Sequence, residues 1–205
     1  MIELYVSCLI TFFVVIDPPG CAPIYAGLTA GATPTHARAM AVRAVLVSAA
    51  ILLVFALFGE DLLHALGITL PSFRIAGGIM LFLIALEMVF EKRTQRREDR
   101  AAQVAAEEVE DVSIFPMAMP MIAGPGSIAS VMLLMGRAHG MEESLVVLGA
   151  LATILLVMLG ALLLARPLMR VLGAKIEAVI TRLLGVLLAA LAVQFVIDGL
   201  RVSLT

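Results

Sequence analysis

Six apolar stretches, each long enough to cross a lipid bilayer, constrain the fold of this sequence more than any other feature. They cover residues 3–31, 41–59, 72–90, 113–136, 144–165 and 179–200. A membrane-spanning helix needs about 20 predominantly apolar residues, so six spans with short connections use nearly all of the 205 residues. The sequence therefore predicts an all-α integral membrane protein with six transmembrane helices, in a single membrane domain over residues 1–205. No basic segment precedes the first stretch, which is expected to be retained as a span.

The composition agrees with a protein that lies almost wholly in the bilayer. Hydrophobic residues make up 62% of the chain and charged residues 15%, whereas an ordinary soluble domain is nearer half apolar and a quarter charged. The formal net charge of −2 gives no basis for binding nucleic acid. Cys8 and Cys21 show no metal-binding spacing, and the sequence has neither an HExxH nor a P-loop motif. We expect no cofactor, no metal and no enzymatic activity.

The distribution of basic residues predicts the orientation in the membrane, because Lys and Arg near span ends favour the cytoplasmic side. Eleven basic residues lie in or beside the loops after the first, third and fifth spans: Arg38, Arg43, Lys92, Arg93, Arg96, Arg97, Arg100, Arg166, Arg170, Lys175 and Arg182. Only Arg74, Arg137 and Arg201 lie on the other side. Both termini are therefore expected outside the cell. The segment 91–111, which holds 12 of the 30 charges, is expected to be a solvated cytoplasmic loop with some helix.

The two halves of the sequence resemble each other. Residues 16–20 read IDPPG and residues 122–126 read IAGPG, an offset of 106, while RIAG at 74–77 and RLLG at 182–185 are offset by 108. Each half has three spans, so the second half would enter the membrane from the opposite side. We predict an inverted-topology repeat, an architecture common in secondary transporters, with halves 1–90 and 112–205. The alternative is a chance match of short apolar strings.

Both halves contain a break in their first span. Asp17-Pro18-Pro19-Gly20, followed by Pro23, interrupts the first span, and Pro116, Pro120 and Ala123-Gly124-Pro125-Gly126 interrupt the fourth. Prolines remove backbone donors and clash with the preceding turn. At about 1.5 Å per residue, both breaks fall near the middle of a hydrocarbon core about 30 Å thick. We expect 17–23 and 120–127 to unwind opposite each other.

Irregular backbone at that depth is tolerated only where it is buried in protein or lines a watery cavity. The paired breaks are therefore a candidate binding site, unless the prolines only kink the helices for packing. The predicted substrate-binding residues are Asp17, Gly20, Cys21, Pro23, Ala123, Gly124, Pro125, Gly126 and Ser127. The glycines would let the backbone approach a ligand, and the N-terminus of each restarting half-helix would hold a carboxylate. The Ser127 hydroxyl would serve either as a helix cap or as a ligand contact.

Asp17 is the only ionisable residue deep in a span, so it is expected to face the interior and to have a partner. Three roles are open for it: a cap on the restarting helix, a partner for a substrate ammonium group, or a carrier of the coupling proton. Glu87 and Asp198 lie near span ends and are expected at the membrane interface, and Gln194 is a candidate for a hydrogen bond across helices.

At these residues the sequence resembles the MarC family of bacterial inner-membrane proteins. The resemblance covers FFVVIDPPGCAPIY (12–25), RIAGGIMLFLIALEM (74–88), PMAMPMIAGPGSIAS (116–130) and TRLLGVLLAALAVQFVIDG (181–199). It implies six spans, a location in the inner (plasma) membrane, and kinship with transporters of small neutral amino acids such as glycine and alanine.

Carried over by position, the first family motif matches Asp17, Pro18, Gly20 and Pro23, and the second matches Pro120, Ala123, Gly124, Pro125 and Gly126. Members usually have Asn where this sequence has Cys21, so a polar contact expected there is missing or comes from the backbone.

The sequence thus predicts a secondary transporter that moves a small neutral amino acid by alternating access. Asp17 would take the ammonium group or couple transport to an ion, either a proton or sodium. One alternative is an exporter of metabolites or drugs. Another is a membrane protein that transports nothing and acts through partners bound at 91–111, which deletion of that segment would reveal. No feature of the sequence specifies an oligomeric state.

Overall fold

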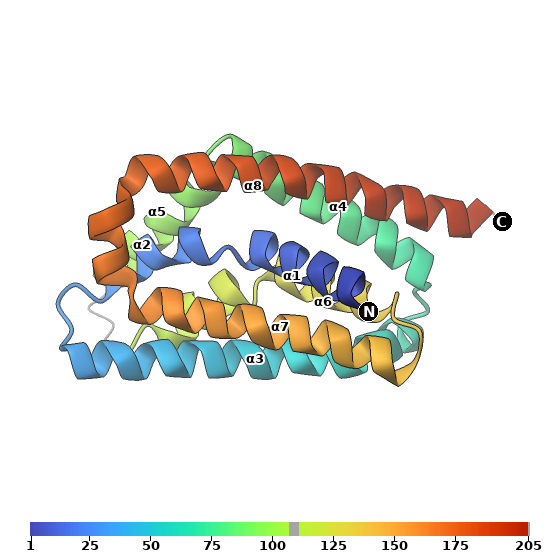
Figure 1. The fold of residues 1–205 in the computed structure, drawn as a ribbon, viewed down its shortest axis with the longest axis horizontal. Coiled ribbons are helices and arrows are strands. Elements are labelled where there is room, and N and C mark those ends of the chain that lie inside the picture. The colour runs from blue at the N-terminus through green and yellow to red at the C-terminus, as the bar shows by residue number, and fades with distance from the viewer. Residues whose placement is uncertain (107–110, 205) are drawn as a thin grey trace.

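The structure, a computed structural model, describes residues 1–106 and 111–204, and for residues 104–106 and 169–177 it describes only the course of the helix. All regular elements in the described ranges are helical (Figure 1). They are α1 (Ile2–Ile16), α2 (Pro18–Leu28), α3 (Pro34–Ala65), α4 (Leu70–Val89), α5 (Lys92–Ala106), η1 (Ser113–Ile122), α6 (Pro125–Met135), α7 (Gly140–Leu163) and α8 (Ala165–Leu204). The long helices run side by side, and both termini lie at the same end of the bundle (Figure 1).

Six segments are apolar and long enough to cross a membrane when the bent pair of η1 and α6 is taken as one span. The other five are Ile2–Leu28, Pro34–Ala65, Leu70–Val89, Gly140–Leu163 and Ala178–Leu204. Large apolar side chains such as Leu46, Phe58 and Leu156 are exposed on the outside of the bundle, which suits a surface that faces lipid. The predicted all-α membrane fold is confirmed.

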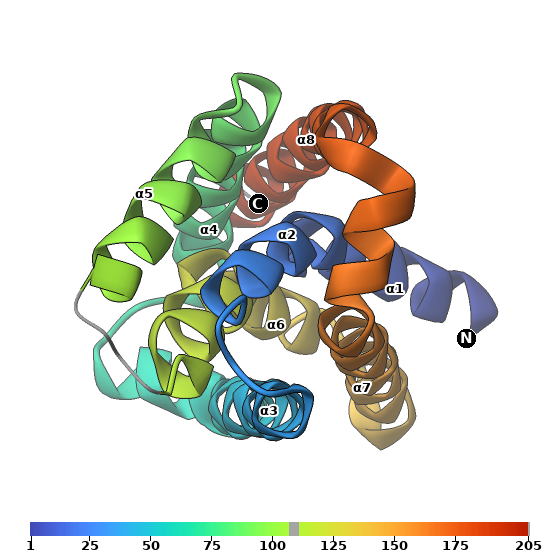
Figure 2. The ribbon, with the colours of Figure 1, turned by 90° about the vertical axis from the view of Figure 1, so that its left-hand side faces the viewer.

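The broken span α1–α2 lies in the interior of the bundle at α2 and at the adjoining end of α1, whereas the N-terminal end of α1 extends outward (Figure 2). It contacts α7, α8 and α6, while α3 contacts η1, α6 and α7, and α4 packs along α8. Three pairs of equivalent spans are thus in contact: α1 with α6, α3 with α7, and α4 with α8. An inverted repeat would produce such pairs, and the repeat of 1–90 and 112–205 itself stays a prediction.

The first break is a single residue. Asp17 has a left-handed backbone conformation, with φ 60° and ψ 64°, and α2 starts immediately after it at Pro18. Pro18 and Pro19 occupy the first helical turn, where a backbone N–H would have no intrahelical partner in any case, and Pro23 lies inside the helix. The expectation that residues 17–23 unwind was therefore wrong, because prolines that break one helix can begin the next.

The second break is longer. Phe115 and Met119 have extended backbone, with φ/ψ of −125°/126° and −127°/125°, since a residue that precedes a proline is pushed out of the helical region. Gly124 is also extended, at φ −81° and ψ 174°, and α6 begins at Pro125. The axes of η1 and α6 differ by 52°. The fourth span is therefore broken as predicted, but the expectation that residues 120–127 unwind was wrong for 125–127, which are helical.

The polar segment 91–111 differs most from expectation. Lys92–Ala106 form α5, which contacts α2, α4 and η1 at the end of the bundle opposite the termini (Figures 1 and 2). The helix expected within this segment is therefore confirmed, but it packs against the spans instead of lying free in solvent. Residues 107–110 of the segment lie outside the described residues, as do the side chains of Arg170 and Lys175, which contributed to the predicted orientation.

Candidate functional site

Asp17 is held by two hydrogen bonds at the first break. Its side chain is 1% exposed. Oδ1 accepts a hydrogen bond of 3.1 Å from the backbone N–H of Gly20, so Asp17 caps α2, which is one of the three roles left open for it. Oδ2 accepts a hydrogen bond of 2.9 Å from Nη1 of Arg97 on α5. The partner expected for an aspartate at this depth is thus an arginine that sequence reasoning placed in solvent.

Arg97 also joins the first break to the second. Its Nη2 lies 3.5 Å from the carbonyl oxygen of Met121, near the end of η1. The start of α6 adjoins the end of α1, because a Cβ atom built at Gly126 would lie 3.4 Å from Cγ1 of Val15. The two broken spans therefore meet, and an α5 side chain contacts both of them.

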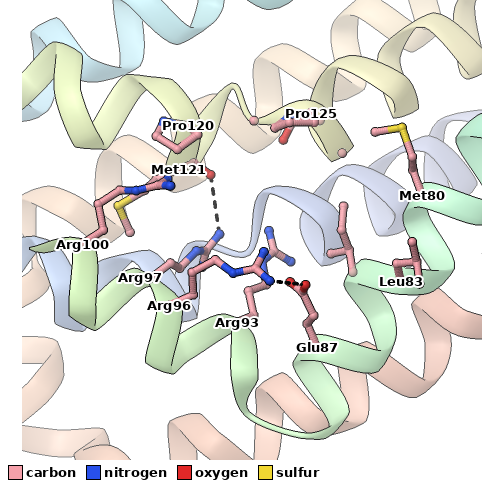
Figure 3. Close-up of a pocket in the computed structure, with 14 residues that line it drawn as sticks. Met80, Leu83, Glu87, Arg93, Arg96, Arg97, Arg100, Pro120, Met121 and Pro125 are labelled. Carbon is pink, nitrogen blue, oxygen red and sulfur yellow. Dashed lines mark hydrogen bonds and ion pairs between the residues drawn. The ribbon is translucent and has the colours of Figure 1, made fainter.

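A pocket of about 410 Å³ lies beside the second break, between α4, α5, η1 and α6 (Figure 3). Its lining residues are Met80, Leu83, Ile84 and Glu87 of α4, Arg93, Arg96, Arg97 and Arg100 of α5, Pro120 and Met121 of η1, and Gly124, Pro125, Gly126 and Ser127 at the start of α6. Figure 3 shows Arg97 and Arg100 extending from α5 toward Met121 at the end of η1, and Arg96 extending toward Glu87 of α4. This volume is within the range of pockets that bind small molecules.

The start of α6 presents backbone donors to this pocket. The first N–H groups of an α-helix have no partner within the helix, and Gly124, the N-cap residue, has no side chain to satisfy them. The Ser127 hydroxyl donates a hydrogen bond of 2.7 Å to the carbonyl oxygen of Ile122, on the other side of the break. Ser127 thus stabilises the broken backbone and leaves the N–H groups of α6 uncapped.

The structure brings together only part of the predicted substrate-binding set. Gly124, Pro125, Gly126 and Ser127 line the pocket, whereas Asp17, Gly20, Cys21, Pro23 and Ala123 do not. Cys21 and Ala123 are fully buried, and the Cys21 thiol lies 3.6 Å from the carbonyl oxygen of Ile16. Pro23 lines a separate pocket between α2 and α5.

The glycines at the breaks accommodate protein atoms. A Cβ at Gly20 would lie 2.3 Å from Oδ2 of Asp17, and a Cβ at Gly124 would lie 2.3 Å from the carbonyl oxygen of Pro120. A Cβ at Gly126 would lie 2.6 Å from Cδ1 of Ile84. These contacts give each glycine a packing role that the sequence interpretation, close approach of a ligand, did not include.

Sequence reasoning missed the four arginines of α5. Arg93 donates a hydrogen bond of 2.7 Å to the carbonyl oxygen of Val15, directly before the first break. Arg96 forms an ion pair of 2.6 Å with Glu87 and is 64% exposed. The signal that could have found them is their spacing, since residues three or four apart lie on one face of a helix.

Two other predictions concern polar residues near span ends. Glu87, expected at the interface, lines the pocket with 25% of its side chain exposed. Asp198 on α8 forms an ion pair with Arg137, which follows α6. The predicted bond of Gln194 across helices was wrong, because its Nε2 donates to Oδ1 of Asp198, one turn away on α8, over 2.7 Å.

Comparisons with known proteins agree with this membrane architecture. A sequence model described as "MarC family integral membrane protein" matches residues 2–204. A UPF0056 membrane protein of Methanocaldococcus jannaschii is 34% identical over 99% of this chain and 98% of its own length. The UPF0056 inner membrane protein YhgN of Escherichia coli K12 is 32% identical over 96% of this chain and 95% of its own length. No solved structure matches the sequence. With relatives aligned over nearly its whole length, the chain belongs to the MarC family of integral membrane proteins.

Proposed function

We propose that this protein is a secondary transporter that moves small amino acids of the glycine and alanine type across the membrane by alternating access. The observation that carries the proposal is the meeting of two broken spans around a buried carboxylate, Asp17, next to a pocket that contains the uncapped start of α6. A protein with a purely structural membrane role has no need for such a charge in its interior, which is expensive in lipid.

The start of α6 offers a place for the substrate carboxylate. The N–H groups of Gly126 and Ser127 belong to the first turn of the helix, where the partial positive charge of the helix dipole favours an anion. Glu87 lines the same pocket and supplies a carboxylate for an ammonium group. Asp17 can receive this group only after Arg97 has moved away, since both of its oxygens already accept hydrogen bonds.

The ion pair between Asp17 and Arg97 suggests how transport is coupled to a proton. Protonation of Asp17 removes the negative charge that holds Arg97, so α5 can withdraw from the breaks and open the pocket toward its own side. By the distribution of basic residues, that side is the cytoplasm, and both termini face the periplasm. At the opposite end, the pair of Arg137 and Asp198 is suited to keep α6 and α8 together while the cytoplasmic side is open.

The location proposed for the protein is the inner (plasma) membrane of a bacterium. The Escherichia coli relative YhgN is named an inner membrane protein, and the six apolar segments suit a multi-pass protein of that membrane.

Transport by purified protein in liposomes tests the proposal. Liposomes loaded with unlabelled glycine or alanine should take up the labelled amino acid by exchange, and an imposed proton gradient should drive accumulation. Asp17→Asn should abolish the gradient-driven accumulation while the protein still assembles. The matched control is Asp61→Asn, which removes an exposed carboxylate from α3. Absence of exchange for every amino acid would contradict the proposed substrate, and normal accumulation by Asp17→Asn would remove Asp17 from the coupling.

Because α5 contacts the first break, deletion of residues 91–111 does not distinguish a transporter from a protein that acts through partners. Deletion of 91–111 was expected to spare a transporter and to inactivate a protein that acts through partners. Arg93 and Arg97 contact the first break, so deletion would also disturb a transporter. Substitution of the exposed residue Lys92, on the same helix, is the milder test of a partner-binding role.

A further inference from the structure

The pocket at the second break contains more positive than negative charge. Four arginines of α5 and one carboxylate, Glu87, are among its lining residues. Asp17 adds a second carboxylate directly behind Arg97. Four positive charges against two negative charges leave a surplus of two positive charges among the described residues of this site.

The two surplus positive charges are those of Arg93 and Arg100, because the other two arginines form ion pairs with carboxylates. Arg97 pairs with Asp17, and Arg96 pairs with Glu87. Arg93 bonds instead to neutral acceptors, the carbonyl oxygen of Val15 at 2.7 Å and Sδ of Met88 at 3.1 Å. Arg100 has no hydrogen bond or ion pair to any residue that the structure describes.

Arg93 carries its charge in a place where water cannot screen it well. Burial, and next the positive charge of Arg97, lower the pKa of Arg93 to about 10, so its guanidinium stays protonated at neutral pH. Asp17 and Glu87 act on Arg93 in the opposite direction, but no carboxylate bonds to it directly, and a partly buried charge with only neutral partners is unfavourable. A ligand that supplies negative charge therefore gains more here than it would at a solvated arginine.

The other residues that line the pocket determine which kind of anionic ligand fits it. Met80, Leu83 and Ile84 of α4 form an apolar wall, and the uncapped start of α6 adds further donors opposite α5 (Figure 3). A ligand with two anionic groups joined by a short carbon chain matches this combination, because its ends meet the donors while its methylene groups contact α4. A neutral amino acid brings one carboxylate and one ammonium group, so it would leave the net charge of the site unchanged.

We propose that this pocket binds a small organic dianion, of the class of four-carbon dicarboxylates, with Arg93 and Arg100 as the groups that recognise its charge. The inference rests on the transport function proposed above and extends the cargo from neutral amino acids to dianions, which the pocket prefers. One anionic group of the ligand lies at Arg93 and the start of α6. The other lies at Arg100, in the C-terminal half of α5.

Three probes of one shape and different charge test the inference by binding to purified protein in detergent. They are succinate, its monoamide succinamate and its diamide succinamide, which carry two, one and no negative charges. Succinate should raise the melting temperature most, because a ligand that binds only the folded protein stabilises it. Each lost charge should weaken binding by about ten-fold, as expected for hydrogen bonds to charged groups, and added salt should weaken the binding of succinate.

Variants of α5 locate the binding site. Arg100→Gln should weaken succinate binding by about ten-fold and leave succinamide unaffected. Lys92→Gln is the matched control, since it removes one positive charge from the exposed part of the same helix, outside the pocket. Equal binding of the three probes, or equal losses in the two variants, would overturn the inference.

Transport measurements separate the inference from the proposed function. Exchange of labelled succinate in liposomes is expected. Exchange of glycine without binding of succinate would overturn the inference and leave the transport function in place, whereas binding of succinate without exchange of any solute would overturn the transport function. A phospholipid head group presents similar charge, so phosphatidic acid is added to the binding assay. If it displaces succinate and succinate is not exchanged, the pocket is a lipid site and the claim of a dianionic cargo is wrong.

Discussion

Asp17 and Arg97 are eighty residues apart in the sequence and form an ion pair of 2.9 Å, with side chains 1% and 10% exposed. The pair joins the helix break in the first span to α5, a helix that contains no apolar span of its own. Because both side chains are removed from water, the pair is not equivalent to the exposed ion pair of Arg96 and Glu87. Each of its two charges is therefore stabilised mainly by the other.

Arg97→Gln should destabilise the protein more than the double variant Asp17→Asn, Arg97→Gln does. Loss of one partner from a buried pair costs about 3 to 5 kcal/mol, because the other charge stays buried without compensation. The double variant removes both charges and should recover part of this loss. Thermal unfolding of the single and double variants in detergent measures the coupling. Additive effects of the two substitutions would contradict the prediction, as would an effect of Arg97→Gln no larger than that of Arg96→Gln.

Gly20→Ala should disturb Asp17 without changing any charge. The added Cβ would lie 2.3 Å from Oδ2 of Asp17, and the carboxylate cannot move without losing its bonds to Arg97 or to the Gly20 N–H. The expected loss of stability is about 1 to 3 kcal/mol, typical of overpacking at a close-packed position. Gly27→Ala on the same helix is the control, since nothing lies within 4 Å of its Cβ position. Comparable melting temperatures for the two variants would argue against a special role for Gly20.

The positions of the spans could be predicted because they depend on local composition. A long run of apolar residues is stable in a bilayer only as a membrane-spanning helix. Pro18 and Pro125 each stand at the first position of a helix, a preference that is local to the sequence. The extent of the first break could not be predicted from the prolines, since the same residues can end one helix or begin another. The left-handed conformation of Asp17 decides between the two, and it depends on the bonds to Gly20 and Arg97.

Gly124→Ala should force the backbone at the second break into a different conformation. A Cβ there would lie 2.3 Å from the backbone carbonyl oxygen of Pro120, and a backbone atom cannot move aside as the end of a side chain can. We expect a loss of about 2 kcal/mol or more, in the upper range for overpacking, together with loss of transport. Gly160→Ala on α7 has no atom within 4 Å of the new Cβ and should be neutral or slightly stabilising. A Gly124→Ala variant that is as stable and as active as Gly160→Ala would contradict the close approach of Gly124 to the carbonyl oxygen of Pro120.

The composition of the site could be predicted only in part. The residues from Gly124 to Ser127 line the pocket and were found because a Gly-Pro-Gly sequence inside an apolar span is unusual. The arginines of α5 were missed because a charged segment between spans is ordinarily solvated. Their contribution depends on α5 packing against α2, α4 and η1, a tertiary contact that composition does not reveal. The spacing of Arg93, Arg97 and Arg100 was the available signal, and it predicts a shared helix face without naming the partner of that face.

Ser127→Ala should lower stability and leave ligand affinity nearly unchanged. The Ser127 hydroxyl donates to the carbonyl oxygen of Ile122 over 2.7 Å, and its loss leaves a buried acceptor without a partner, at a cost of about 1 to 3 kcal/mol. Ser130→Ala is the control, because the buried Ser130 hydroxyl, one turn further along α6, has no hydrogen-bond partner among the described residues. Melting temperature and the affinity of the protein for glycine and for succinate are measured for both variants. A loss of affinity in Ser127→Ala at unchanged melting temperature would show that the hydroxyl contacts the ligand, and the role of Ser127 in holding the two sides of the break together would then be wrong.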